Sequence, residues 1–115
     1  MKGAILLLAG AGLLAAGAQA VAPKTAEQQL SGGQSLYQRW CATCHAAGPR
    51  MPGTLALEVK YQGARSAVLE ESGVPVAMTT FVVRHGMGAM PRFRKTEISD
   101  PDLAAIAAYL DHPER

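Results

Sequence analysis

Residues 41–45 read Cys-Ala-Thr-Cys-His, and this stretch constrains the chain more than any other part of its sequence. Two cysteines three positions apart lie on one helical turn, where each thiol can add to one vinyl group of a haem. The histidine that follows is then held beside the ring, where its imidazole can ligate the iron. The pattern predicts one covalently bound haem c, attached through Cys41 and Cys44, with His45 as the proximal axial ligand.

A Cys-x-x-Cys pair is also typical of redox dithiols and of half a zinc site. A dithiol of the thioredoxin type is expected near a βαβ pattern, which this sequence lacks. A zinc site needs a second pair of ligands, and Cys41 and Cys44 are the only cysteines in the chain. Haem attachment is therefore the interpretation that the residues favour.

The first twenty residues have the organisation of a secretory signal peptide. A basic start at Lys2 is followed by an apolar run, and Ala18-Gln19-Ala20 forms an A-x-A cleavage site. The alternative is a retained membrane anchor, but this run is shorter than the roughly 20 residues that a span needs. We expect residues 1–20 to be removed, leaving a chain that begins at Val21 and has no stable membrane span.

The mature chain is expected to be one small domain. Removing Lys2 leaves ten basic residues against the nine acidic ones, a balance that argues against nucleic-acid binding. A core of this size is only marginally stable by itself. A covalent haem would add apolar surface and cross-links.

The polar residues 21–30 are expected to form a flexible lead-in, with the domain proper at 31–115. A helix is predicted to start with Ser31 as its N-cap, because apolar residues then recur at steps of three and four into the haem motif. Gly33 shares a face with Tyr37, where a small residue lets another helix come close. The other interpretation of Gly33 is a turn beside Gly32.

Residues 46–53 are predicted to form a loop, because they contain two prolines and two glycines. A metal-bound histidine normally donates its second N–H to a carbonyl or carboxylate. We expect the carbonyl of Pro52 to accept this bond from His45, with Pro49 as the alternative.

Three further helices are indicated. The first is a short helix within residues 64–72, and the second begins at Pro75 and ends at Gly86. The last is capped by Ser99 or Asp100, and it has an apolar stripe that should cross the first helix near Gly33 and Tyr37.

The second informative stretch is Gly86-Met87-Gly88-Ala89-Met90-Pro91, because an iron with one histidine ligand needs a sixth ligand or an open site. A methionine opposite a histidine raises the reduction potential. Met87 and Met90 are both candidates, and Met90, before the stiffening proline, is the expected distal ligand. His85 and His112 are the rivals, which would give two histidine ligands.

With these residues in place, the chain resembles class I cytochromes c. The resemblance rests on Gly33 and Tyr37 before the haem motif, the Gly/Pro loop, Met90-Pro91-x-Phe93, and the final helix. It implies an all-α fold, the small class I cytochrome c fold, with helices packed around the attached haem.

More narrowly, the chain resembles the cytochrome subunit of flavocytochromes of the p-cresol methylhydroxylase and eugenol hydroxylase type. Residues 31–37, 83–93 and 93–100 carry this resemblance. It implies a periplasmic subunit without catalysis of its own, which takes single electrons from an FAD-containing para-alkylphenol hydroxylase subunit. The electrons would pass to a soluble acceptor, either a cupredoxin or another cytochrome.

Arg92, Arg94 and Lys95 follow the expected methionine ligand and are candidates for docking an acidic partner, unless they are simply a solvated group of charges. Two other functions stay open. One is a free-standing, diffusible electron carrier of a respiratory chain. The other is a haem sensor or haem enzyme in which the sixth ligand is displaced.

Overall fold

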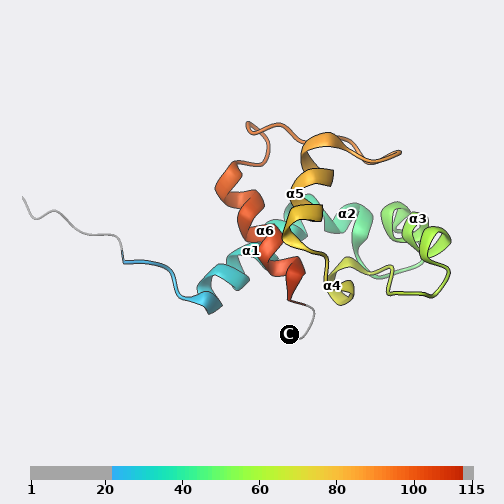
Figure 1. The fold of residues 1–115 in the computed structure, drawn as a ribbon, viewed down its shortest axis with the longest axis horizontal. Coiled ribbons are helices and arrows are strands. Elements are labelled where there is room, and N and C mark those ends of the chain that lie inside the picture. The colour runs from blue at the N-terminus through green and yellow to red at the C-terminus, as the bar shows by residue number, and fades with distance from the viewer. Residues whose placement is uncertain (1–21, 113–115) are drawn as a thin grey trace, which may run out of the picture.

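A computed structural model describes residues 22–112, and all of its regular elements are helices (Figure 1). These are α1 (Ala26–Trp40), α2 (Ala42–His45), α3 (Pro52–Tyr61), α4 (Leu69–Ser72), α5 (Val76–His85) and α6 (Asp100–Asp111). The described residues contain no β-strand, only an isolated antiparallel bridge between Met87 and Met90. The all-α prediction is therefore confirmed.

The centre of the molecule is the packing of α1 on α6, which also packs on α5 and α4 (Figure 1). Gly33 is buried in this contact, and a Cβ there would lie 2.3 Å from the carbonyl oxygen of Ala105. One turn later the ring of Tyr37 lies 5.8 Å from that of Tyr109. The predicted crossing at Gly33 and Tyr37 is confirmed, since only a residue without a Cβ lets the two backbones come this close.

The apolar core is built mainly from α6 and the residues that face it. Its buried members are Tyr37, Ala42, Val83, Ile98, Leu103, Ile106, Ala107, Tyr109 and Leu110. The hydroxyl of Tyr109 donates to Glu70, and the backbone N–H of Val74 donates to the Leu110 carbonyl at 3.0 Å. These bonds attach α4 and the segment after it to α6.

Helix α1 begins earlier than the sequence predicted. Its N-cap is Thr25, whose side chain accepts from the N–H of Gln28, while the Gln28 side chain accepts from the N–H of Thr25. This reciprocal capping box satisfies two N–H groups that would otherwise lack partners. The predicted N-cap at Ser31 is therefore wrong, and the expected boundary between lead-in and domain at residue 31 falls inside the helix.

The other helices match the predictions in part. Helix α5 fills the predicted span after Pro75, which is its N-cap, and Gly86 is its C-cap at a φ of 75°. Ser99 caps α6 by accepting from the Asp102 N–H, as expected. Only residues 69–72 of the predicted short helix are helical. Helix α3 was not predicted, and it places Pro52 at its first turn instead of in a loop.

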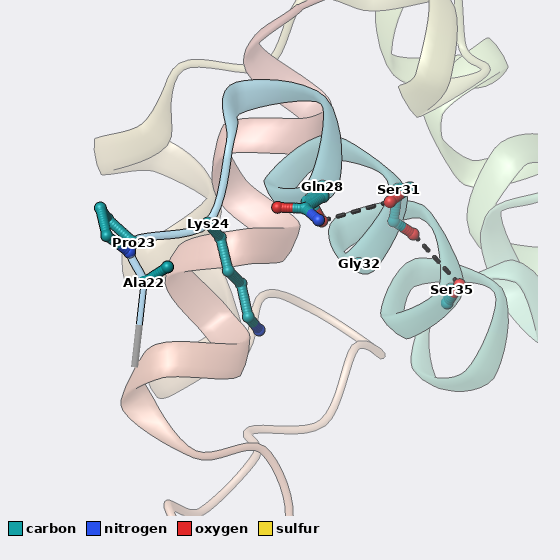
Figure 2. Close-up of a pocket in the computed structure, with 7 residues that line it drawn as sticks. All are labelled: Ala22, Pro23, Lys24, Gln28, Ser31, Gly32 and Ser35. Atoms are coloured by element: carbon teal, nitrogen blue, oxygen red, sulfur yellow. Dashed lines mark hydrogen bonds between the residues drawn. The ribbon is translucent and has the colours of Figure 1, made fainter. Parts of the chain in front are cut away.

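An open hollow lies beside the N-terminal half of α1 (Figure 2). The hydroxyl of Ser31 donates to the Gln28 carbonyl at 3.2 Å, and that of Ser35 donates to the Ser31 carbonyl at 3.1 Å. Both serines therefore bond to their own helix. The hollow is lined by Ala22, Pro23, Lys24, Gln28, Ser31, Gly32 and Ser35.

The predicted signal segment, residues 1–20, lies outside the described residues. Within residues 22–112, no helix combines the length and the apolar character that crossing a membrane requires.

Candidate haem site

A second pocket brings together four of the residues that the sequence singled out, Cys41, Cys44, His45 and Met90. They come from two parts of the chain, the end of α1 with α2 and the segment after α5. The remaining lining is apolar and consists of Trp40, Val83, Pro91, Phe93 and Ile98. The attachment motif and the expected sixth ligand therefore share one apolar pocket.

The two thiols are presented by a short helical turn that follows α1. Cys41 ends α1 with its N–H donating to the Tyr37 carbonyl at 2.8 Å. The N–H groups of Cys44 and His45 then donate back to the Cys41 carbonyl at 3.1 and 2.9 Å. The two cysteines do not form a disulfide. Burial, with a smaller contribution from Cys44, raises the pKa of the Cys41 thiol to about 11.

The imidazole of His45 is suited to metal ligation because burial lowers its pKa and favours the neutral ring. Its Nδ1 atom is buried without a hydrogen-bond partner among the described residues. The predicted bond from this nitrogen to the Pro52 carbonyl is therefore not made, and Pro49 does not supply one either. The prediction for Pro52 is wrong because this residue belongs to the first turn of α3 and not to a loop beside the imidazole.

Two hydroxyl groups, which sequence reasoning did not assign to the site, hold the backbone at His45. Tyr37 donates to the His45 carbonyl at 2.9 Å, and Thr54 donates to the Ala46 carbonyl at 2.8 Å. Both side chains are almost fully buried, at 0% and 1% exposure. Burial, followed by the nearby Glu70, raises the pKa of Tyr37, so its hydroxyl remains a donor. These bonds fix the chain immediately after the histidine.

Gly53 is a further residue of the site that the sequence did not reveal. A Cβ at this position would lie 2.5 Å from Cε1 and 2.7 Å from Nδ1 of the His45 ring. Glycine therefore lets the start of α3 lie directly against the imidazole. The Pro52-Gly53 pair is the signal in the sequence, but the Gly and Pro content of residues 46–53 predicts a loop instead of a helix start.

Met90 and Met87 face each other across a tight turn but have different surroundings. Each donates its N–H to the carbonyl of the other, at 3.0 and 3.2 Å. Met90 packs against the core and lines the pocket. Met87 is 46% exposed, and its sulfur lies 3.9 Å from the Lys60 ammonium. Of the two candidates, only Met90 lines the pocket that contains His45.

Neither rival histidine lines this pocket. His85 ends α5 on the surface, where its ring stacks on Phe81 at 4.4 Å and its Nδ1 lies 2.8 Å from the Phe81 carbonyl oxygen. His112 is the C-cap of α6. The arrangement therefore favours a thioether over a second imidazole.

The expected docking residues lie at the surface, but two of them are paired. Arg94 lies 3.6 Å from Glu97, and Lys95 lies 2.7 Å from Asp100. Arg92 is exposed and makes no ion pair with another residue of the described part of the chain. Most of the positive charge of this group is therefore balanced locally.

The pocket residues fit a covalently attached haem. Two thiols and a neutral imidazole lie on one turn, a thioether lines the same pocket, and aromatic and aliphatic side chains form the walls. Soft sulfur and imidazole ligands suit iron in this setting. An all-helical fold with this pocket defines the class of c-type cytochromes.

Comparison with known proteins agrees with that class. The family described as cytochrome c oxidase, cbb3-type, subunit III matches residues 28–110, and the chain belongs to this family of cytochrome c domains. The protein accordingly carries a covalently bound haem c and transfers electrons.

Two relatives are similar in sequence. The cytochrome c subunit of 4-cresol dehydrogenase (hydroxylating) from Pseudomonas putida is 33% identical over 99 residues, which cover 86% of this chain and 72% of that protein. Cytochrome c6 from Tetradesmus obliquus is 31% identical over 84 residues, which cover 70% of this chain and 86% of that protein.

The fold is also similar to that of a solved structure. This is the crystal structure of p-cresol methylhydroxylase with substrate bound, with a TM-score of 0.50 and 32% sequence identity. The match covers 72% of this chain and 93% of the other. The resemblance that the sequence indicated is thereby confirmed.

Proposed function

We propose that this protein is the electron-transfer subunit of a flavocytochrome, in which an FAD-containing partner oxidises a para-alkylphenol. The observation that carries the proposal is its 33% identity, over most of its length, to a cytochrome c subunit of 4-cresol dehydrogenase. The similarity to the p-cresol methylhydroxylase structure supports the same partner class. Electrons would pass singly to a cupredoxin or another cytochrome, and the signal-like residues 1–20 would direct the chain to the periplasm.

Four side chains would hold the haem in this proposal. Cys41 and Cys44 form the thioethers, His45 is the proximal iron ligand and Met90 is the distal ligand. The bound haem supplies a one-electron iron couple, whose potential this ligand pair raises. Tyr37 and Thr54 hold the backbone beside His45 through their bonds to the carbonyls of residues 45 and 46.

The ligand assignment predicts a clear difference between two methionine variants. Met90→Ala should remove the sulfur-to-iron charge-transfer band of the oxidised protein, while the haem stays attached. Met87→Ala should retain the band, because the Met87 sulfur lies at the surface beside Lys60. Visible spectroscopy of both purified variants measures this. Loss of the band in Met87→Ala alone would show that Met87 is the ligand.

The partner is tested by isolating the tagged protein from its native cells and measuring flavin in the purified material. A flavin-containing partner that reduces the haem when p-cresol is added supports the proposal. Flavin-free protein that is not reduced by p-cresol in the cell extract contradicts it. That result would favour a free-standing carrier, which the similarity to cytochrome c6 also supports.

The rate of carbon monoxide binding distinguishes a haem sensor or haem enzyme from a flavocytochrome subunit and from a free-standing carrier. A thioether that stays on the iron makes binding to the reduced wild-type protein slow. Fast binding to the wild type, equal to that of Met90→Ala, would favour a displaceable sixth ligand and contradict electron transfer as the sole role.

A further inference from the structure

Arg84 lies in the last turn of α5, and its side chain is turned inward, with only 16% exposed. Its guanidinium donates to the Phe93 carbonyl at 3.2 Å, to the Ile98 carbonyl at 2.9 Å and to the Asp100 carboxylate at 2.8 Å. All three acceptors follow Met90 in the sequence. One side chain therefore joins the end of α5 to the exit of the Met90 segment and to the start of α6.

The segment that carries Met90 has little structure of its own. Between α5 and α6, the Met87–Met90 bridge and the bonds that Arg94 makes within residues 94–98 are local. One backbone bond, from the Phe93 N–H to the Val83 carbonyl at 2.8 Å, attaches the exit of the turn to α5. Arg84 adds its bond to the carbonyl of the same Phe93. The position of Met90 thus depends on how firmly residue 93 is held to α5.

The Asp100 carboxylate is shared between two basic side chains. Asp100 accepts from Arg84 through Oδ1 and from Lys95 through Oδ2, the latter at 2.7 Å. It stands in the first turn of α6, where the helix dipole favours a negative charge. A planar guanidinium can bond three acceptors at fixed angles, which the single ammonium of a lysine cannot reproduce.

We propose that Arg84 is a positioning residue for Met90, so that the strength of the sixth iron ligand is set by a side chain that does not line the pocket. This inference rests on the proposed ligation by Met90. Removing the guanidinium frees the exit of the turn at Phe93, while Gly86 and Gly88 at its entry already have positive φ, where the backbone is free to adjust. An external ligand should then displace the thioether more easily.

The test measures the affinity of imidazole for the oxidised, haem-loaded protein. Arg84→Gln should bind imidazole about tenfold more tightly than wild type, or more, because three charge-assisted bonds are lost. Arg84→Lys keeps the charge without the fork and should give an intermediate affinity. The matched control is Arg65→Gln, because Arg65 also donates to a backbone carbonyl, that of Ser72 at 3.0 Å, outside the Met90 segment. The control should bind imidazole as wild type does.

The outcomes separate this inference from the ligation on which it rests. If Met90→Ala retains the charge-transfer band, the ligation is wrong and the inference falls with it. If Met90→Ala loses the band while Arg84→Lys and Arg84→Gln bind imidazole as wild type does, only the positioning role is overturned. If Arg84→Gln fails to fold, the imidazole affinities of Arg84→Lys and Asp100→Asn still test the positioning role. Each variant weakens the bonds of Arg84 without removing all of them, so each should bind imidazole more tightly than wild type.

Discussion

Two adjacent glycines in α1 provide a matched test of how the first and last helices pack. Both are inside the helix, where glycine costs about 0.5–1 kcal/mol relative to alanine. A Cβ at Gly32 would have no heavy atom within 4 Å. Gly32→Ala should therefore stabilise the protein by about 0.5–1 kcal/mol.

Gly33→Ala has the same local benefit but meets the neighbouring helix. Its Cβ would lie 2.3 Å from the Ala105 carbonyl oxygen and 2.7 Å from the Tyr109 Cβ. Neither atom is at the end of a flexible side chain, so the helices must move apart. Overpacking costs about 1–3 kcal/mol, and these short contacts favour the upper end. The net loss should be about 2 kcal/mol after the gain in helix propensity.

Thermal unfolding of the two haem-loaded variants measures the difference. For a domain of this size, 1 kcal/mol shifts Tm by about 4–8 °C. Gly33→Ala should unfold about 8–16 °C below wild type, whereas Gly32→Ala should unfold slightly above it. Far-UV circular dichroism and haem absorbance should give coincident transitions. If both variants move Tm in the same direction by the same amount, the packing described for α1 and α6 is wrong.

Three further predictions concern the surroundings of the pocket. Tyr37→Phe removes the donor to the His45 carbonyl and should lower the free energy of unfolding by about 1–3 kcal/mol, as measured in denaturant. Thr54→Val should cost a similar amount through the Ala46 carbonyl, and an unchanged midpoint would refute this. Bonds from Lys95 and then Arg84 hold the pKa of Asp100 below its ordinary value. Because the folded pKa is the lower one, the stabilisation is present above the unfolded pKa of about 4 and is lost as pH falls below it. Asp100→Asn should therefore flatten the fall in stability between about pH 5 and pH 2, and an unchanged profile would contradict the assignment.

The features that the sequence predicted correctly are those that depend on local chemistry. The haem motif is defined by two cysteines spaced on one helical turn. Ser99 followed by Pro101 marks a helix start, because serine is preferred at the N-cap and proline in the first turn. The packing role of Gly33 was also predicted, because it shared a face with Tyr37. Local patterns thus defined the helices α5 and α6 and the side of α1 that α6 covers.

The features that were missed or wrong depend on weaker patterns or on distant contacts. The start of α1 was misplaced because Thr25 and Gln28 cap a stretch with no apolar periodicity. Helix α3 was missed because its apolar residues alternate weakly, as in a strand, and do not recur at the steps of three and four that indicate a helix. The bonds from Tyr37 and Thr54 join residues eight positions apart, and the inward turn of Arg84 depends on acceptors up to sixteen positions away. No local pattern reveals such partners.

The contact between α1 and α6 also has a consequence for biosynthesis. Helix α6, which covers Gly33, is translated after α1, so this face of α1 stays uncovered until residues 100–111 have been made. We infer that a chain without α6 does not complete its core, because most of the buried apolar residues of the described chain lie on that helix. A chain ending at residue 99 should remain sensitive to protease, whereas protease resistance of that shortened chain would contradict the inference.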